Sequence, residues 1–229
     1  MDRAAIFDFN GTLFWDSEIN YISWNNCIER WFNRPYTREL YAQLNGRTNE
    51  ETLEVLYGKK LDSRFVSKKS NEKTAEYLRV LESQSQSISL ARGAESLFKA
   101  LIDDGIKIAI ATSAPTDLMV HYERYFNLSR FFKDEFIISS DGSIPSKPDP
   151  TIYLKTIERL NVDPSSCIVF EDTKSGILSA HKAKVNKVIA INSDGSDIKT
   201  TSTMKETSMS IDSFEDLKFK TLFDGMEDQ

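Results

Sequence analysis

Six short apolar runs are spread along this chain of 229 residues, and segments with helical periodicity separate most of them. The runs show little of the apolar–polar alternation that a half-exposed strand has. Continuous apolar runs are typical of parallel strands covered by helices on both faces, and strands that alternate with helices form a parallel α/β sheet. The sequence predicts strands at residues 4–9, 106–112, 135–139, 167–172, 187–191 and 209–211.

The two clearest helices between these strands are expected at residues 93–105 and 149–161. In the first, we expect one buried stripe to contain Leu97, Leu101 and Ile102. The second has Pro150 near its first turn, where proline is tolerated. Its predicted buried stripe contains Ile152, Leu154, Ile157 and Leu160. The expected core is therefore a Rossmann-like, three-layer α/β fold, with a parallel sheet between two layers of helices.

The segment between the first and second predicted strands has helix patterns and no convincing strand. Helices are expected at 17–32, 48–58 and 70–83, and Thr48 with Glu51 forms the pattern of a capping box. The polar stretch 82–89 is interpreted as the return hinge. We therefore predict an inserted α-helical cap domain at residues 17–89, and a core domain made of residues 1–16 and 90–229.

Composition excludes several classes of protein. The net charge of -6 and pI near 5.1 argue against a dedicated nucleic-acid binder, which usually has a basic surface. No apolar run is long enough for a membrane span, and no secretory signal is visible. Cys27 and Cys167 are too far apart in sequence for a CxxC motif, so a zinc site or structural disulfide is not expected. We expect a cytoplasmic monomer or weak dimer without a nucleic-acid or membrane partner.

Polar residues follow the predicted strands at the edge where ligands bind in open parallel sheets. The first strand is followed by Asp8, Asn10, Gly11 and Thr12, and the second by Thr112 and Ser113. Lys147 follows the third strand, and the fourth ends in Glu171 and Asp172. Three carboxylates, a lysine and hydroxyl groups in one crevice suit an anionic substrate held through a divalent cation such as Mg²⁺.

Each of these residues has a simpler interpretation when it is taken alone. Asp8 could cap a turn, and Thr112 with Ser113 could begin a helix. Lys147 could belong to a plain turn, and Glu171 with Asp172 could be a solvated strand end. Their occurrence in order, at four strand ends, favours one shared site over four separate coincidences.

Four segments together resemble the haloacid dehalogenase-like superfamily of phosphotransferases. They are D-x-N-G-T-L at 8–13, the strand ending in Thr112, Lys147 in "SKPDP", and "FEDTKSGILSAHKA" at 170–183. The helical insert resembles the subclass I cap of the β-phosphoglucomutase and phosphoglycolate phosphatase branches. The resemblance implies a phosphatase or phosphotransferase that acts on a small phosphorylated metabolite.

The resemblance also implies roles for individual residues. Asp8 would be the nucleophile, Thr112 would hydrogen-bond a phosphoryl oxygen, and Lys147 would neutralise negative charge. Mg²⁺ would be held by Asp8, Asp172 and the backbone carbonyl of Asn10, with Glu171 acting directly or through water. Backbone groups around Phe9 and Gly11 would bind the phosphate, together with Ser113. In the cap, Arg47 could contact a phosphate or carboxylate of the substrate, or could be a solvated residue before a helix.

Asn10 departs from the resembling family, whose active members usually have an aspartate there as the acid and base. An asparagine side chain cannot transfer a proton near neutral pH. Three hypotheses follow: a slow or leaving-group-selective phosphatase, a catalytically silent phosphoester-binding module, or an Asn10 variant of an active phosphatase or mutase. In the third case, deamidation at Asn10-Gly11 could convert some molecules to the acid. The sequence does not identify the substrate, or decide between a hydrolase and a mutase.

Overall fold

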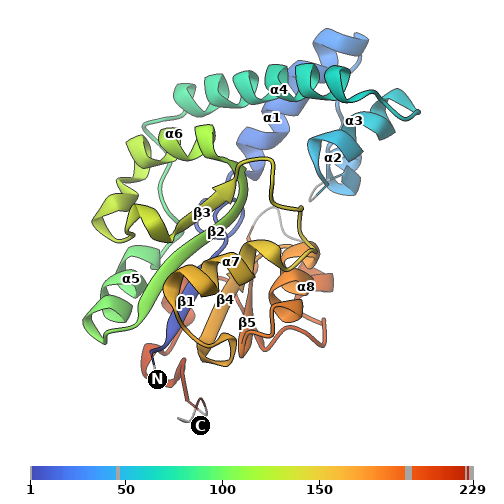
Figure 1. The fold of residues 1–229 in the computed structure, drawn as a ribbon. Coiled ribbons are helices and arrows are strands. Elements are labelled where there is room, and N and C mark those ends of the chain that lie inside the picture. Colours follow the sequence, from blue (N-terminus) through green and yellow to red (C-terminus); the bar gives the residue numbers. More distant parts are fainter. Residues whose placement is uncertain (1, 45–46, 194–197, 225, 227–229) are drawn as a thin grey trace. The chain divides into compact units, whose positions relative to one another are not determined.

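In a computed structural model that describes residues 2–44, 47–193, 198–224 and 226, six strands form one parallel sheet (Figure 1). The strands are β1 (Ala4–Phe7), β2 (Lys107–Pro115), β3 (Ile137–Ser140), β4 (Cys167–Glu171), β5 (Lys187–Ile191) and β6 (Met209–Ile211). Their order across the sheet is β3-β2-β1-β4-β5-β6. The central strand β1 pairs on both sides, with Ala4 opposite both Lys107 and Cys167.

The six predicted strands are present, with bounds that differ from the prediction by up to three residues. Two of these differences are at the carboxyl ends of β1 and β2. Strand β1 ends at Phe7, earlier than predicted, because the chain turns after Asp8. Strand β2 continues to Pro115 although a strand end at Thr112 was predicted. Its pairing with β3 shifts register between Ala111 and Pro115, so the strand extends past a local irregularity into polar residues.

Helices lie on both faces of the sheet, which confirms the predicted Rossmann-like α/β class. The helices of this part are α5 (Ala94–Asp103), α6 (Thr116–Phe126), α7 (Thr151–Leu160), α8 (Lys174–Lys182) and α9 (Ile198–Thr201). Ile6 and Val169 face α7 and α8 in one apolar cluster. On the other face, Phe7 stacks on Phe170 and meets Phe98 of α5 edge to face. Short 3-10 helices are Leu128–Arg130, Asp134–Phe136, Pro164–Ser166, Phe214–Asp216 and Phe219–Thr221.

Two expected core positions are wrong. The side chains of Ile102 and Leu154 are each 44% exposed. Successive helix residues point in directions about 100° apart, so one narrow stripe cannot hold every apolar residue of a run. Leu101 and Tyr153 occupy the fully buried positions beside them.

The chain divides into two compact units, Met1–Trp15 with Ser89–Gln229, and Asp16–Ile88. The second unit is helical, and the capping box of Thr48 and Glu51 is present. Its helices are α1 (Ser17–Phe32), α2 (Arg38–Leu44), α3 (Asn49–Tyr57) and α4 (Ser63–Ser83). Its apolar core contains Trp24, Ile28, Tyr36, Tyr41, Leu44, Leu53 and Leu56.

Both cysteines are buried and free, and burial raises the pKa of the Cys27 thiol to about 11 and that of Cys167 to about 12. Cys167 therefore packs as a small apolar residue of the sheet. Within the described residues, no helix is both long and apolar enough to cross a membrane.

Candidate active site at the carboxyl edge of the sheet

Asp8 lies directly after β1, and the turn that follows it folds back tightly. The backbone N–H of Asp8 donates to the carbonyl of Phe170 at 3.0 Å, which extends the pairing with β4 by one residue. The turn closes through a 2.7 Å hydrogen bond from the N–H of Gly11 to the carbonyl of Phe14. Gly11 has a φ of +82°, and a Cβ atom there would lie 2.0 Å from a carboxylate oxygen of Asp172. Glycine is therefore required for the turn to approach Asp172.

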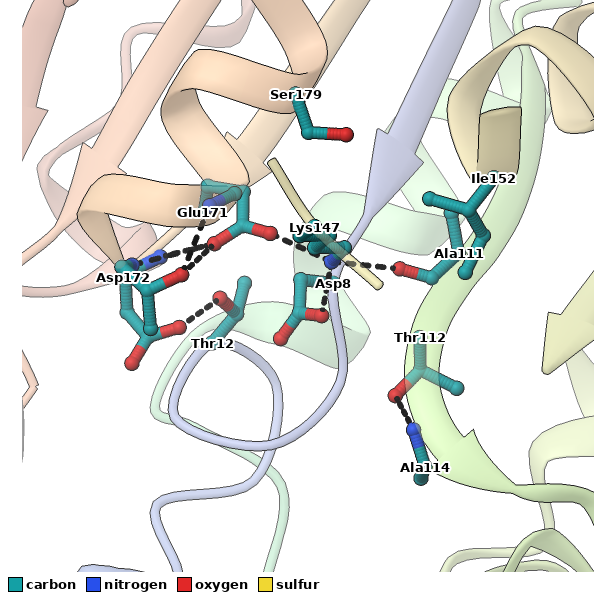
Figure 2. Close-up of polar contacts among 12 residues, drawn as sticks. Asp8, Thr12, Ala111, Thr112, Ala114, Lys147, Ile152, Glu171, Asp172 and Ser179 are labelled. Carbon is teal, nitrogen blue, oxygen red and sulfur yellow. Dashed lines mark hydrogen bonds and ion pairs between the residues drawn. The ribbon is translucent and has the colours of Figure 1, made fainter. Parts of the chain in front are cut away.

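Lys147 joins three parts of the site through its ammonium group (Figure 2). Its Nζ donates at 2.6 Å to Oδ1 of Asp8, at 2.6 Å to Oε1 of Glu171, and at 3.2 Å to the carbonyl of Ala111. Burial alone would lower the pKa of Lys147, but the charges of Asp8 and Glu171 outweigh burial and raise it above its ordinary value. Lys147 is therefore a fixed cation in contact with Asp8.

Asp172 follows the end of β4 and is buried beside the turn. Its Oδ1 accepts a 3.2 Å hydrogen bond from the hydroxyl of Thr12, as Figure 2 shows. Burial and the negative charges of Glu171 and Asp8 raise the pKa of Asp172 well above its ordinary value. A bound cation would counter these effects and favour the ionised carboxylate.

The donor set is suited to a hard cation. One ligand atom from each of Asp8, Glu171 and Asp172 lies within 4.8 Å of the others, and the three residues are buried. They offer carboxylate oxygens, which Mg²⁺ prefers, and three carboxylates exceed the single positive charge of Lys147. The chemistry and the charge of these residues therefore fit a divalent cation.

Thr112 and Ser113 lie within β2, where the sequence had predicted the strand end. Thr112 is buried, and its Oγ1 accepts a 3.1 Å hydrogen bond from the N–H of Ala114. This bond uses the hydroxyl as an acceptor, so its own proton can be donated elsewhere. Thr112 directly follows Ala111, whose carbonyl is bound by Lys147. Ser113 is exposed.

Asn10 is held by a residue that the sequence did not single out. Its Nδ2 donates a 2.8 Å hydrogen bond to the hydroxyl of Tyr122 in α6. The ring of Tyr122 is fully buried and stacks on Phe9, with 4.6 Å between ring centres. The side chain of Phe9 is thus part of the core, and only its backbone remains for the predicted contact with phosphate.

Tyr153 is the second functional candidate that sequence reasoning missed. Its hydroxyl donates to Glu171 at 2.8 Å, and burial, followed by the charge of Glu171, raises its pKa well above the ordinary value. Tyr122 and Tyr153 lie on the buried faces of α6 and α7, so their pattern looks like core packing. The unusual signal was a polar-tipped ring at a fully buried position, which requires a hydrogen-bond partner.

Arg47, the predicted residue of the cap, belongs to the helical unit and is exposed. Its N–H donates to the carbonyl of Leu44 at 3.2 Å. Residues 45–46 of the predicted substrate loop lie outside the described residues. The role of Arg47 in substrate binding stays a prediction.

Known proteins are similar to this chain both in sequence and in fold. The phosphorylated carbohydrates phosphatase of Thermotoga maritima is 29% identical over 193 residues, which cover 82% of this chain and 85% of that protein. β-Phosphoglucomutase of Bacillus subtilis is 26% identical over 186 residues, with coverage of 79% and 80%. A crystal structure of a HAD hydrolase, family IA, variant 3, from Entamoeba histolytica has a TM-score of 0.91 and 33% identity, over the whole of both chains.

A sequence model of one family matches most of the chain. The model describes haloacid dehalogenase-like hydrolases, and it matches residues 5–191, from β1 to the end of β5. The match includes Asp8, Lys147 and Asp172, the residues whose side chains meet at the carboxyl edge of the sheet. The chain therefore belongs to the haloacid dehalogenase-like hydrolases.

Proposed function

We propose that this protein is a Mg²⁺-dependent phosphatase of small phosphorylated metabolites, and that Asp8 takes up the phosphoryl group. The contact between Asp8 and Lys147, at 2.6 Å in a buried site, carries this proposal. The ammonium group of Lys147 holds this carboxylate in position and can neutralise charge on an incoming phosphoryl group. Family membership and the similarity to phosphatases support the same reaction class.

In the first step, a carboxylate oxygen of Asp8 attacks phosphorus and the bond from phosphorus to the ester oxygen breaks. The hydroxyl of Thr112 would donate to a phosphoryl oxygen. Negative charge develops on the leaving oxygen, which must gain a proton. Asn10 has none to give, so the proton comes from water, and a leaving group that is stable as an anion departs fastest.

In the second step, water attacks phosphorus and the bond to Asp8 breaks, which restores the carboxylate and releases inorganic phosphate. An aspartate at position 10 would remove a proton from this water. With Asn10, the water loses its proton to solvent. General acid–base help is typically worth about 10² to 10⁴ in rate, so both steps are slow relative to an enzyme that has the acid.

Mg²⁺ would be held by the carboxylates of Asp8 and Asp172 and by the backbone carbonyl of Asn10. When bound, it supplies positive charge to a phosphoryl oxygen and orients the phosphate for attack. Replacement of an aspartate side chain by an amide at position 10 leaves the carbonyl ligand in place. Metal binding and catalytic power are therefore separable at this residue.

The substrate is proposed to be a small phosphorylated metabolite such as a sugar phosphate. The names of the relatives from T. maritima and B. subtilis support this class. We propose that the helical unit Asp16–Ile88 is the cap domain, and that Arg47 binds a phosphate or carboxylate of the substrate. Backbone groups of Phe9 and Gly11, with Ser113, would complete the phosphate site.

The amide of Asn10 favours a second candidate, a phosphoester-binding module without turnover. Such a protein would keep the Mg²⁺ site, Lys147 and the phosphate site. It would lack the acid–base carboxylate that completes the reaction. Calorimetric titration with sugar phosphates in Mg²⁺ distinguishes the two. Saturable binding with no phosphate released over hours indicates the module, whereas release of phosphate indicates the enzyme.

The proposed function is tested by Mg²⁺-dependent release of phosphate from acetyl phosphate and p-nitrophenyl phosphate. We expect turnover of both by the wild type, and none by Asp8→Asn or after chelation of Mg²⁺. Asp134→Asn, at an exposed position that begins the short 3-10 helix before β3, serves as the matched control and should retain activity. Turnover by Asp8→Asn at the wild-type rate would contradict the assignment of Asp8.

A further inference from the structure

Tyr153 is placed in the core by α7, with its hydroxyl at the end of β4. The side chain is fully buried, and the hydroxyl donates at 2.8 Å to Oε1 of Glu171. The same ring lies under Lys147, with 4.9 Å between Nζ and the ring centre. Tyr153 therefore contacts both members of the buried Lys147–Glu171 ion pair, Glu171 through its hydroxyl and Lys147 through its ring.

The carboxylate of Glu171 is saturated by hydrogen bonds. Its Oε1 accepts from Lys147 at 2.6 Å and from Tyr153 at 2.8 Å. Its Oε2 accepts from the N–H of Asp172 at 3.1 Å, and from the N–H and hydroxyl of Thr173 at 3.2 and 3.1 Å. A carboxylate offers about four lone-pair positions, so these donors occupy both oxygens.

Surrounding atoms also fix the position of Glu171. A Cβ atom on Gly176 would lie 1.9 Å from the carboxyl carbon of Glu171, so α8 approaches the carboxylate as closely as a glycine permits. Asp172 differs from this neighbour. Among the described residues, the hydroxyl of Thr12 is the hydrogen-bond partner found for the Asp172 side chain.

Lys147 is held as firmly as Glu171. An ammonium group has three protons, and those of Lys147 are directed to Asp8, Glu171 and the carbonyl of Ala111. Loss of the Glu171 contact would leave the ammonium free to move away from Asp8. The position of the cation at Asp8 thus depends on how well Glu171 is held.

We propose that Tyr153 is a positioning residue for phosphoryl transfer. Its hydroxyl holds Glu171, and Glu171 in turn anchors Lys147. Mg²⁺ is then bound by the carboxylates of Asp8 and Asp172 and not by Glu171. This inference rests on the proposed function and goes beyond it. It removes Glu171 from the metal ligands that the sequence suggested and gives it a different task. It also assigns a role to a tyrosine hydroxyl that does not touch the substrate.

The experiment combines Tyr153→Phe with Glu171→Gln, Asp172→Asn and the double variant Tyr153→Phe/Glu171→Gln. Tyr153→Phe removes one hydroxyl and keeps the buried ring beneath Lys147. Hydrolysis of p-nitrophenyl phosphate gives kcat and KM, and calorimetry with Mg²⁺ alone gives the metal Kd and the number of sites. Tyr125→Phe is the matched control, because Tyr125 lies in α6 and none of the hydrogen bonds or ring contacts described for Lys147 and Glu171 involves it.

We expect kcat of Tyr153→Phe to fall about tenfold, the ratio that corresponds to one hydrogen bond to a charged group. The KM and the Kd for Mg²⁺ should stay within about threefold of wild type, since neither the phosphate site nor a metal ligand is changed. One Mg²⁺ site per chain would show that the variant is fully folded. In the Glu171→Gln background, Tyr153→Phe should lower kcat little further, because the anchor of Lys147 is already lost.

Three results would overturn the inference. The first is a Kd for Mg²⁺ that weakens in Tyr153→Phe in step with kcat. The second is a loss from Tyr153→Phe that is equally large with Glu171 and with Gln at that position, as expected of a purely structural residue. The third is a loss of activity in Tyr125→Phe equal to that in Tyr153→Phe.

If the wild type hydrolyses no phosphoester, the proposed function fails and the role of Tyr153 in phosphoryl transfer fails with it. The Mg²⁺ titration still tests the assignment of the metal ligands in that case. We expect Asp172→Asn to weaken Mg²⁺ binding at least about tenfold more than Glu171→Gln does. Equal weakening by the two variants, or no Mg²⁺ binding by the wild type, would contradict the proposed ligand set.

Discussion

The carboxamide of Asn10 donates a 2.8 Å hydrogen bond to the hydroxyl of Tyr122, a fully buried residue of α6. Asn10 is therefore held in place by the core of its own unit. A tyrosine hydroxyl can both donate and accept, so the same position also accommodates an aspartate. The effect of the amide on catalysis can thus be measured in a variant that keeps the local fold.

The first prediction concerns deamidation, which requires the N–H nitrogen of Gly11 to attack the side chain of Asn10. That N–H donates to the carbonyl of Phe14, and Tyr122 holds the carboxamide. We expect Asn10 to stay an amide in the folded protein, and Tyr122→Phe to deamidate about tenfold faster, the ratio that corresponds to one hydrogen bond of ~1.4 kcal/mol.

The measurement is peptide mass mapping of residues 4–30 during incubation at neutral pH. Protein unfolded in urea is the control, and Asn10 should deamidate faster there than in the folded wild type. Rapid conversion in the folded wild type would contradict the protection inferred from these bonds. It would instead favour a mixed population that contains the acid.

A second prediction concerns the charge balance of the site. Lys147→Met leaves Asp8, Glu171 and Asp172 without their buried cation. Removal of one partner from a buried ion pair typically costs about 3–5 kcal/mol in the free energy of unfolding. We expect a loss of this size in urea denaturation at neutral pH without metal, and partial recovery when Mg²⁺ is added.

Lys155→Met is the matched control, because Lys155 is exposed on α7 and forms no ion pair among the described residues. Its effect should stay within about 0.5 kcal/mol, as for ordinary surface substitutions. If Lys147→Met were as stable as this control, the three carboxylates would not form the electrostatic cluster described above.

A third prediction concerns Lys73, which is buried in the helical unit. Burial, opposed in part by the charge of Asp16, lowers its pKa to about 8. Between about pH 8 and 10.5, the unfolded chain therefore binds more protons at this lysine than the folded chain does. The free energy of unfolding should rise with pH in this window through Lys73.

The measurement compares wild type with Lys73→Met, so that the titration of other groups cancels. Their difference in unfolding free energy should move by about 2 kcal/mol in favour of the wild type between pH 7 and 10. Tryptophan fluorescence suits the measurement because Trp24 and Trp31 both lie in the helical unit. A difference that is constant with pH would mean that the pKa of Lys73 is not lowered.

The sheet and the outline of the site could be predicted because burial on both faces produces continuous apolar runs. Strand ends then mark where polar residues meet, which brought Asp8, Lys147 and Asp172 together correctly. The end of β2 was predicted too early because the polar Ser113 and the strand-breaking Pro115 indicate a loop. In the structure both residues stay in β2, whose pairing with β3 shifts register there. Pattern alone does not reveal such a local irregularity.

Contacts that depend on helix rotation could not be predicted. Tyr122 and Tyr153 read as ordinary core residues, and only the packed structure places their hydroxyls on Asn10 and Glu171. Leu154 was predicted to be buried from the same periodicity, and its side chain is exposed. Helical periodicity gives a face to within about one residue, whereas a hydrogen bond requires an exact partner.

Asp8 is proposed to perform phosphoryl transfer in a site where Asn10 cannot supply the proton that an aspartate would give. The most direct measurement compares the hydrolysis of acetyl phosphate and of glucose 6-phosphate by wild type and by Asn10→Asp, in Mg²⁺. Acetyl phosphate has a good leaving group, and its kcat should change less than that of the sugar ester. For glucose 6-phosphate, we predict an increase in kcat of about 10² or more. An unchanged or lower kcat for glucose 6-phosphate in Asn10→Asp, with binding of Mg²⁺ intact, would contradict the roles proposed for Asp8 and Asn10.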